Sequence, residues 1–189
     1  MIPELGHFLL ILALGVALAL GVMPMLGAHK GRADWMALAR PLAYWQMALV
    51  LASFVCLAAS FVRHDFSVLY VASNSNSALP LPYRIAAVWG GHEGSLLLWM
   101  LMLAGWTVAV ARFSRSLPQA FVARILAVLG LVAVGFLLFT LITSNPFERL
   151  IPAAADGRDL NPLLQDPGMV IHDRPRRPRR SRRRSSGSP

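Results

Sequence analysis

The chain has 189 residues, of which 56% are hydrophobic and only 14% are charged, a balance typical of membrane proteins rather than of soluble globular domains. The formal net charge is +9, but eight arginines lie between Arg174 and Arg184. Residues 1–171 hold ten Lys/Arg and eight Asp/Glu, a net charge of +2, so the overall charge does not indicate a nucleic-acid-binding protein. The single cysteine, Cys56, excludes an internal disulfide.

Four apolar segments are each long enough to cross a bilayer, which takes about 20 residues. They are residues 5–26, 42–62, 94–111 and 125–142. None contains Lys or Arg. The first segment has no basic residue before it and is longer than the core of a signal peptide, so we expect it to be retained. The sequence therefore predicts an all-α, polytopic membrane protein with about four transmembrane helices.

Basic residues in the short connections predict the orientation of the chain in the membrane. The connections after the first and third segments carry six of them: Lys30, Arg32, Arg40, Arg112, Arg115 and Arg124. The other side carries four: Arg63, Arg84, Arg149 and Arg158. This bias predicts a periplasmic N-terminus, with residues 63–91 and 143 onward forming two periplasmic loops. Both loops are rich in Ser, Asn and Pro, which favour turns.

The stretch AVWGGHEGSLLLWM, residues 87–100, places polar groups at the start of an apolar segment. At about 100° per residue, Trp89, His92, Trp99 and Trp106 form one stripe of a helix, with Glu93 about 100° away. One interpretation is a water-facing helix end with interfacial tryptophans. Another is an aromatic surface for a planar apolar ligand. A third is a proton or ion carrier that uses Glu93 and His92.

Two stretches, WGGHEGSLLLW at residues 89–99 and GRDLNPLLQDPG at residues 157–168, resemble the CcmF family. CcmF is the membrane subunit of the bacterial cytochrome c maturation haem lyase, and a relative acts in nitrite reductase assembly. The resemblance runs from Met1 to His172. It implies that residues 1–172 are the N-terminal part of a longer, multi-pass protein of the bacterial inner membrane.

The resemblance also implies an activity and a set of partners. The family receives haem from a periplasmic haem chaperone and attaches it covalently to the CxxCH thiols of apocytochrome c. The implied partners are this chaperone, a companion haem lyase subunit, and apocytochrome c with its thioredoxin-like presenter, besides membrane lipid and without nucleic acid.

His172 matches the first of two periplasmic histidines of the family, and we expect it to be an axial ligand of haem b through the haem iron. Trp89, His92 and Glu93 are expected at the same periplasmic-end surface, although the resemblance assigns no ligand role to His92. The family's second periplasmic histidine and its structural haem site have no counterpart in this sequence. We therefore expect an incomplete, inactive fragment without catalytic residues.

The composition changes abruptly after His172. Residues 173–189 consist almost entirely of Arg, Pro and Ser, which predicts a disordered basic tail. The family continues differently after this histidine, so we interpret the tail as the product of a frameshift. The alternative is a genuine tail that binds anionic lipid.

Overall fold

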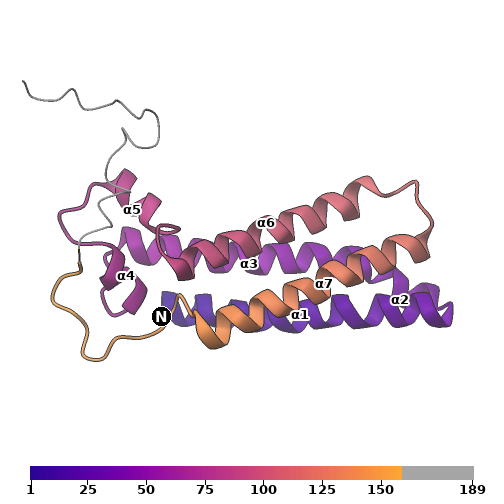
Figure 1. Ribbon diagram of the computed structural model, residues 1–189, viewed down its shortest axis with the longest axis horizontal. Coiled ribbons are helices and arrows are strands. Elements are labelled where there is room, and N and C mark those ends of the chain that lie inside the picture. Colours follow the sequence, from indigo (N-terminus) through magenta and orange to yellow (C-terminus); the bar gives the residue numbers. More distant parts are fainter. Residues whose placement is uncertain (159–189) are drawn as a thin grey trace, which may run out of the picture.

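The computed structural model describes residues 1–158 of the chain, and this part is built from α-helices (Figure 1). In chain order these are α1 (Ile2–Lys30), α2 (Ala33–Ala37), α3 (Ala39–Val62), α4 (Leu69–Asn74), α5 (Leu81–Ala87), α6 (His92–Phe113) and α7 (Gln119–Thr143). Four stretches are long and apolar enough to cross a membrane: Ile2–Lys30, Ala33–Val62, His92–Phe113 and Gln119–Thr143. The prediction of an all-α, multi-pass membrane protein is confirmed.

Each long helix extends beyond its apolar core into residues that favour helix ends. Helix α1 begins with Pro3 in its first turn, where the missing N–H costs no hydrogen bond. It ends at Gly31, whose φ of 65° lies in the left-handed region that glycine adopts without strain. Helix α7 starts directly after Pro118. The apolar runs alone therefore underestimated the lengths of the helices. The largest difference is six residues, at the start of α7.

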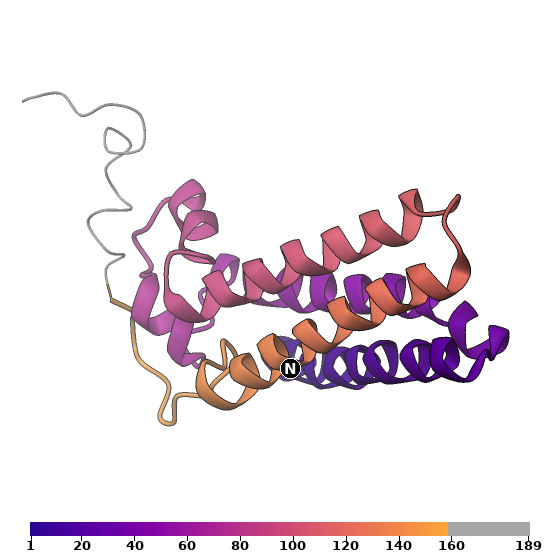
Figure 2. The same cartoon turned by 45° about the vertical axis from the view of Figure 1, so that its right-hand side comes forward.

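The four long helices run up and down as a bundle, in which α1 and α6 each pack against both α3 and α7 (Figures 1 and 2). Small residues permit the closest approach, between α1 and α7. A Cβ on Gly130 would lie 2.9 Å from the backbone nitrogen of Gly21. Such glycine contacts are typical of helix pairs in membranes, where close packing replaces the hydrophobic effect as the source of association.

Alternating helix directions gather the connections at two ends of the bundle. One end, called here the loop end, holds Met1, residues 63–91 and residues 144–158; the other, called the basic end, holds residues 31–38 and 114–118. Residues 63–91, predicted as a loop with turns, also contain two short helices, α4 and α5. Their proline lies where a helix tolerates it, since Pro82 stands in the first turn of α5.

Candidate functional site

The glycine-rich segment before α6 is held by a buried tyrosine of α4. Tyr70 is only 3% exposed. Its phenol oxygen accepts the N–H of Gly91 at 3.0 Å, and its hydroxyl points to the carbonyl oxygen of Val88 at 3.1 Å. Burial raises the pKa of Tyr70 to about 12, with the nearby Glu93 carboxylate acting in the same direction. The phenol therefore stays protonated at neutral pH and can donate as well as accept.

The same contacts explain two of the glycines in WGGHEG. A Cβ on Gly91 would lie 2.7 Å from the Tyr70 ring. A Cβ on Gly94 would lie 1.7 Å from the Val88 carbonyl oxygen, which no side chain can do. Both positions need glycine because the α5–α6 connection folds back against the first turn of α6. The motif is thus a packing device that sets the position of His92 and Glu93.

His92 begins α6 and contacts the end of α7. Its Nδ1 lies 3.1 Å from the Ser144 hydroxyl, and its ring meets Phe139 edge-on at a centroid distance of 6.3 Å. The hydrogen bond uses Nδ1 only, and the residue as a whole is exposed. A histidine oriented through Nδ1 in this way presents Nε2 for a hydrogen bond or an iron ligand.

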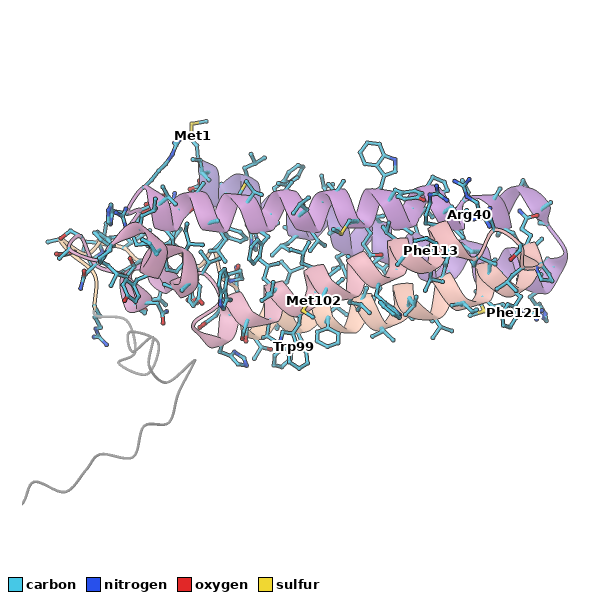
Figure 3. The ribbon with its side chains drawn as sticks, turned by 90° about the horizontal axis from the view of Figure 1, so that it is seen from above. Met1, Arg40, Trp99, Met102, Phe113 and Phe121 are labelled. Atoms are coloured by element: carbon cyan, nitrogen blue, oxygen red, sulfur yellow. The ribbon has the colours of Figure 1, made fainter. Side chains whose placement is uncertain are left out.

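The tryptophans lie on the outside of the bundle and not in its core. Trp99 is 64% exposed and Trp106 is 68% exposed, and Figure 3 shows Trp99 pointing away from the other helices. Trp89 precedes the helix, because Gly91 at its N-cap is extended. The single helical stripe expected from the sequence therefore does not reach Trp89, although Trp89 remains at the loop end and is 42% exposed.

A second histidine, His7 of α1, lies at the loop end and contacts Asn145. The Asn145 side-chain oxygen accepts the N–H of Phe147 at 3.0 Å, so the Asn145 nitrogen must face His7 Nδ1, 3.1 Å away. An amide nitrogen only donates, and Nδ1 is consequently the acceptor. His7 lines a groove of about 440 Å³ between the start of α1 and residues 145–149. Sequence reasoning did not single out His7, because its partner is 138 residues away.

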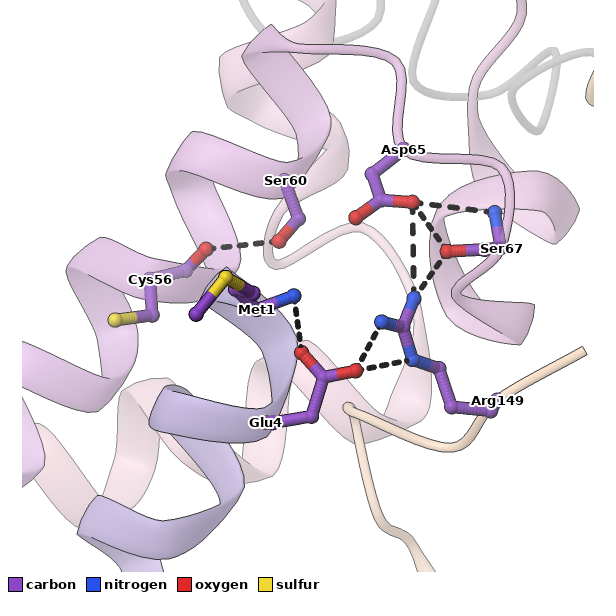
Figure 4. A network of polar contacts seen from close by, with 7 residues as sticks. All are labelled: Met1, Glu4, Cys56, Ser60, Asp65, Ser67 and Arg149. Atoms are coloured by element: carbon purple, nitrogen blue, oxygen red, sulfur yellow. Dashed lines mark hydrogen bonds and ion pairs between the residues drawn. The ribbon is translucent and has the colours of Figure 1, made fainter.

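An arginine after α7 ties the N-terminus to the segment that follows α3 (Figure 4). Arg149 pairs with Glu4, hydrogen-bonds the Ser67 hydroxyl and lies 3.8 Å from Asp65. Backbone hydrogen bonds run alongside, from the Leu69 N–H to the Glu148 carbonyl oxygen at 2.9 Å. The segment after α7 is thereby fixed across the ends of α1 and α3.

The last described residues, up to Arg158, also lie at the loop end. The Arg158 N–H donates to the Ala72 carbonyl oxygen at 2.7 Å, and the Asp156 carboxylate accepts from the Ser77 hydroxyl at 2.8 Å. These hydrogen bonds from Ser77 lower the pKa of Asp156. His172, the expected haem ligand, and the basic tail lie outside the described residues. Within residues 1–158, no group of three or more His, Cys, Asp or Glu side chains could hold a metal ion.

Comparison with known proteins shows which proteins this chain is similar to. Residues 89–173 match the family model for cytochrome C assembly proteins. The chain is 60% identical over 173 residues to the cytochrome c-type biogenesis protein CcmF of Pseudomonas aeruginosa, covering 91% of this chain and 26% of the relative. The CcmF of Escherichia coli K12 is 56% identical over 173 residues, with coverage of 91% and 27%.

This chain is related to the CcmF proteins. A solved structure of a cytochrome c haem lyase CcmF superposes with a TM-score of 0.74 at 30% sequence identity, covering 78% of this chain and 25% of the CcmF chain. The resemblance to the CcmF family seen in the sequence is confirmed. The chain spans about a quarter of the length of the curated CcmF relatives it matches.

Proposed function

We propose that residues 1–172 form the N-terminal part of a haem lyase membrane domain that acts in cytochrome c biogenesis. The observation that carries the proposal is the 60% identity to a CcmF protein over 173 residues. The superposition on a CcmF structure supports it independently, because it concerns the arrangement of the helices. A whole haem lyase would receive haem from a periplasmic chaperone and join it to the CxxCH thiols of apocytochrome c. A companion subunit and a thioredoxin-like presenter complete the proposed partners.

The loop end faces the periplasm in this proposal, and the protein lies in the bacterial inner membrane. The distribution of charge supports this orientation. Six Lys/Arg flank the connections of the basic end, while the four arginines of the loop end are accompanied by five carboxylates: Glu4, Asp65, Glu93, Glu148 and Asp156. Basic residues are retained preferentially on the cytoplasmic side of a membrane.

Haem is the proposed substrate, with His172 as one axial ligand. Arg158 is anchored to Ala72, so the segment that leads toward His172 starts at the same end as Trp89, His92 and Glu93. The exposed Trp89 ring offers a flat apolar contact, and His92 offers its Nε2 atom. The chemistry of these groups fits a planar apolar molecule that carries an iron ion.

The carrier function considered for Glu93 and His92 finds no support in the bundle. A proton path needs polar or ionisable groups at successive depths. The buried polar side chains within the described spanning helices are Gln46, Ser53, Ser60, Thr107 and Thr140, none of which titrates. Glu93 and His92 both lie at the first turn of α6 and lead no further inward.

Haem binding by the full 189-residue chain in detergent tests the proposal. We expect the haem absorbance retained after purification to fall strongly in His172→Ala. His29→Ala is the matched control, because His29 is an exposed histidine near the basic end. Equal haem retention in the two variants would contradict the role of His172.

The orientation is tested separately by thiol labelling in a Cys56→Ser background. Ala78→Cys at the loop end and Ser116→Cys at the basic end place a thiol at exposed positions. A membrane-impermeant reagent added to spheroplasts should label only Ala78→Cys. Labelling of Ser116→Cys alone would show the opposite orientation.

A further inference from the structure

Arg40, the second residue of α3, forms an ion pair with no carboxylate of residues 1–158. Its Nε is buried and forms no hydrogen bond with any described residue. One terminal nitrogen reaches the Ser114 carbonyl oxygen, at a long 3.4 Å. A guanidinium group is always charged, and a buried Nε–H without an acceptor is costly unless an anion binds there.

A small pocket of about 130 Å³ lies beside Arg40. Its lining residues carry no carboxylate and come from two parts of the chain: Met36, Ala37, Ala39 and Arg40, and Gln119, Val122 and Ala123. Helix α7 begins at Gln119, after Pro118, and its start has neither a side-chain cap nor an acidic residue in its first turn. The positive end of α7 therefore lies at the pocket beside Arg40, and both features favour an anion.

The surroundings of the pocket are also positive. Lys30, Arg32, Arg112, Arg115 and Arg124 flank the same end of the bundle. Asp34 is the only carboxylate of the described residues there, and it already pairs with Arg32 at 2.6 Å. Because Asp34 is already paired with Arg32, little negative charge among the described residues would repel an anion that enters the pocket.

A second, apolar groove starts at Pro41, the residue after Arg40, and follows α3 away from the basic end. It has a volume of about 360 Å³ and is lined by Pro41, Tyr44, Trp45 and Ala48. Trp45 is 62% exposed on the outside of α3. At 1.5 Å per residue, Ala48 lies about 12 Å along the helix from Arg40, which is the direction an acyl chain takes below its headgroup. Figure 3 shows Arg40 toward the end of the bundle that also carries Phe121.

We propose that this surface binds one anionic glycerophospholipid. The phosphate group occupies the pocket beside Arg40 and the uncapped start of α7, and an acyl chain lies in the groove of Tyr44 and Trp45. A free phosphate ion would fill only the pocket and leave the groove unused. A zwitterionic lipid would bring a cation into a region where six basic residues, Arg40 included, face one carboxylate, Asp34. The combination of charged pocket and adjoining groove selects an anionic lipid.

The test measures lipid retention by the full chain in neutral detergent, using native mass spectrometry with added phosphatidylglycerol or phosphatidylcholine. We expect the wild type to retain one phosphatidylglycerol molecule in preference to phosphatidylcholine. Arg40→Gln should weaken that binding by about tenfold or more, as expected for charge-assisted hydrogen bonds. Arg115→Gln is the matched control, because it removes the same charge from an exposed position at the same end. The arginines of residues 173–189 remain in every variant and contribute equally.

A second variant separates the headgroup from the chain and guards against loss of folding. Trp45→Ala should weaken phosphatidylglycerol binding and leave the unfolding midpoint without lipid nearly unchanged. If Arg40→Gln does not fold, Arg40→Lys and Trp45→Ala decide the outcome. Equal retention of the two lipids by the wild type, or equal effects of Arg40→Gln and Arg115→Gln, would overturn the proposal. Stabilisation by millimolar inorganic phosphate as large as that by lipid would assign the pocket to a soluble anion instead.

Discussion

Tyr70 accepts a 3.0 Å hydrogen bond from the N–H of Gly91 and thereby joins α4 to the start of α6. The phenol oxygen also lies 2.5 Å from the position that a Cβ of Gly94 would take. The hydroxyl thus occupies space that any larger residue at position 94 would need. One tyrosine and two glycines therefore determine how the loop end is assembled around His92 and Glu93.

Replacement of Gly94 by alanine should destabilise the protein strongly. The added Cβ would lie 1.7 Å from the Val88 carbonyl oxygen, so the backbone itself must shift. We expect a loss of about 3 kcal/mol or more in the free energy of unfolding, measured by thermal unfolding in detergent. Gly105→Ala on the same helix is the control, because a Cβ there meets nothing within 4 Å. It should be neutral or slightly stabilising. Similar losses in both variants would show that helix packing around α6 differs from this structure.

Removal of the Tyr70 hydroxyl should cost about 1–2 kcal/mol, because Tyr70→Phe leaves the Gly91 N–H without its acceptor. It should also change the response to alkaline pH. The pKa of Tyr70 is raised from 10.0 to about 12, so the folded state holds this proton more tightly than the unfolded chain. The resulting stabilisation is complete below pH 10 and is lost as the pH rises toward 12, by up to about 2–3 kcal/mol.

The alkaline effect is measured as the difference in unfolding free energy between wild type and Tyr70→Phe at several pH values. The difference should be constant below pH 10 and shrink above it. A difference that stays constant up to pH 12 would contradict the burial of an un-ionised phenol. Other groups that titrate in this range contribute equally to both proteins and cancel.

Replacement of Gln46 by leucine should raise stability. Gln46 lies in α3 and is 1% exposed, and neither its side-chain oxygen nor its nitrogen bonds to any described residue. Leucine has a similar volume and brings no polar group into the interior. We expect a gain of about 1–3 kcal/mol, read from the unfolding midpoint in detergent. Gln119→Leu at the exposed start of α7 is the control and should change little. A loss of stability in Gln46→Leu would show that the buried amide is hydrogen-bonded in the protein.

The Glu4–Arg149 pair should contribute little by itself although it joins two distant segments. Glu4 is more than half exposed, so solvent screens the attraction. A double-mutant cycle of Glu4→Gln and Arg149→Gln should give a coupling energy below about 1 kcal/mol. Arg149→Gln alone should cost more than Glu4→Gln alone, because Arg149 also contacts Ser67 and Asp65. Equal single effects would assign the whole contribution of Arg149 to Glu4.

The long helices were predictable because the hydrophobic requirement of a membrane span is local. In lipid, the backbone N–H and C=O groups of an apolar run such as residues 125–142 find hydrogen-bond partners within the run itself only when it forms a helix. The short helices α4 and α5 were missed for the opposite reason. Their Ser, Asn and Pro residues indicate turns locally, and contacts such as that of Tyr70 with Gly91 stabilise them from elsewhere in the chain. A sequence pattern carries no information on such distant partners.

The features of the candidate site can likewise be separated into those predictable from the sequence and those that depend on the tertiary structure. The amino-acid sequence by itself determined the four spans, the charge difference between the two ends and the resemblance to CcmF, because each of these is written in residues next to one another. Only the tertiary structure decided that His92 meets Ser144, that His7 meets Asn145 and that Gly94 has no room for a side chain. These relationships join residues up to 138 positions apart, and they exist only once antiparallel helices bring their ends together. Composition and periodicity predict which residues share a face of a helix. Which other helix packs against that face depends on the tertiary structure.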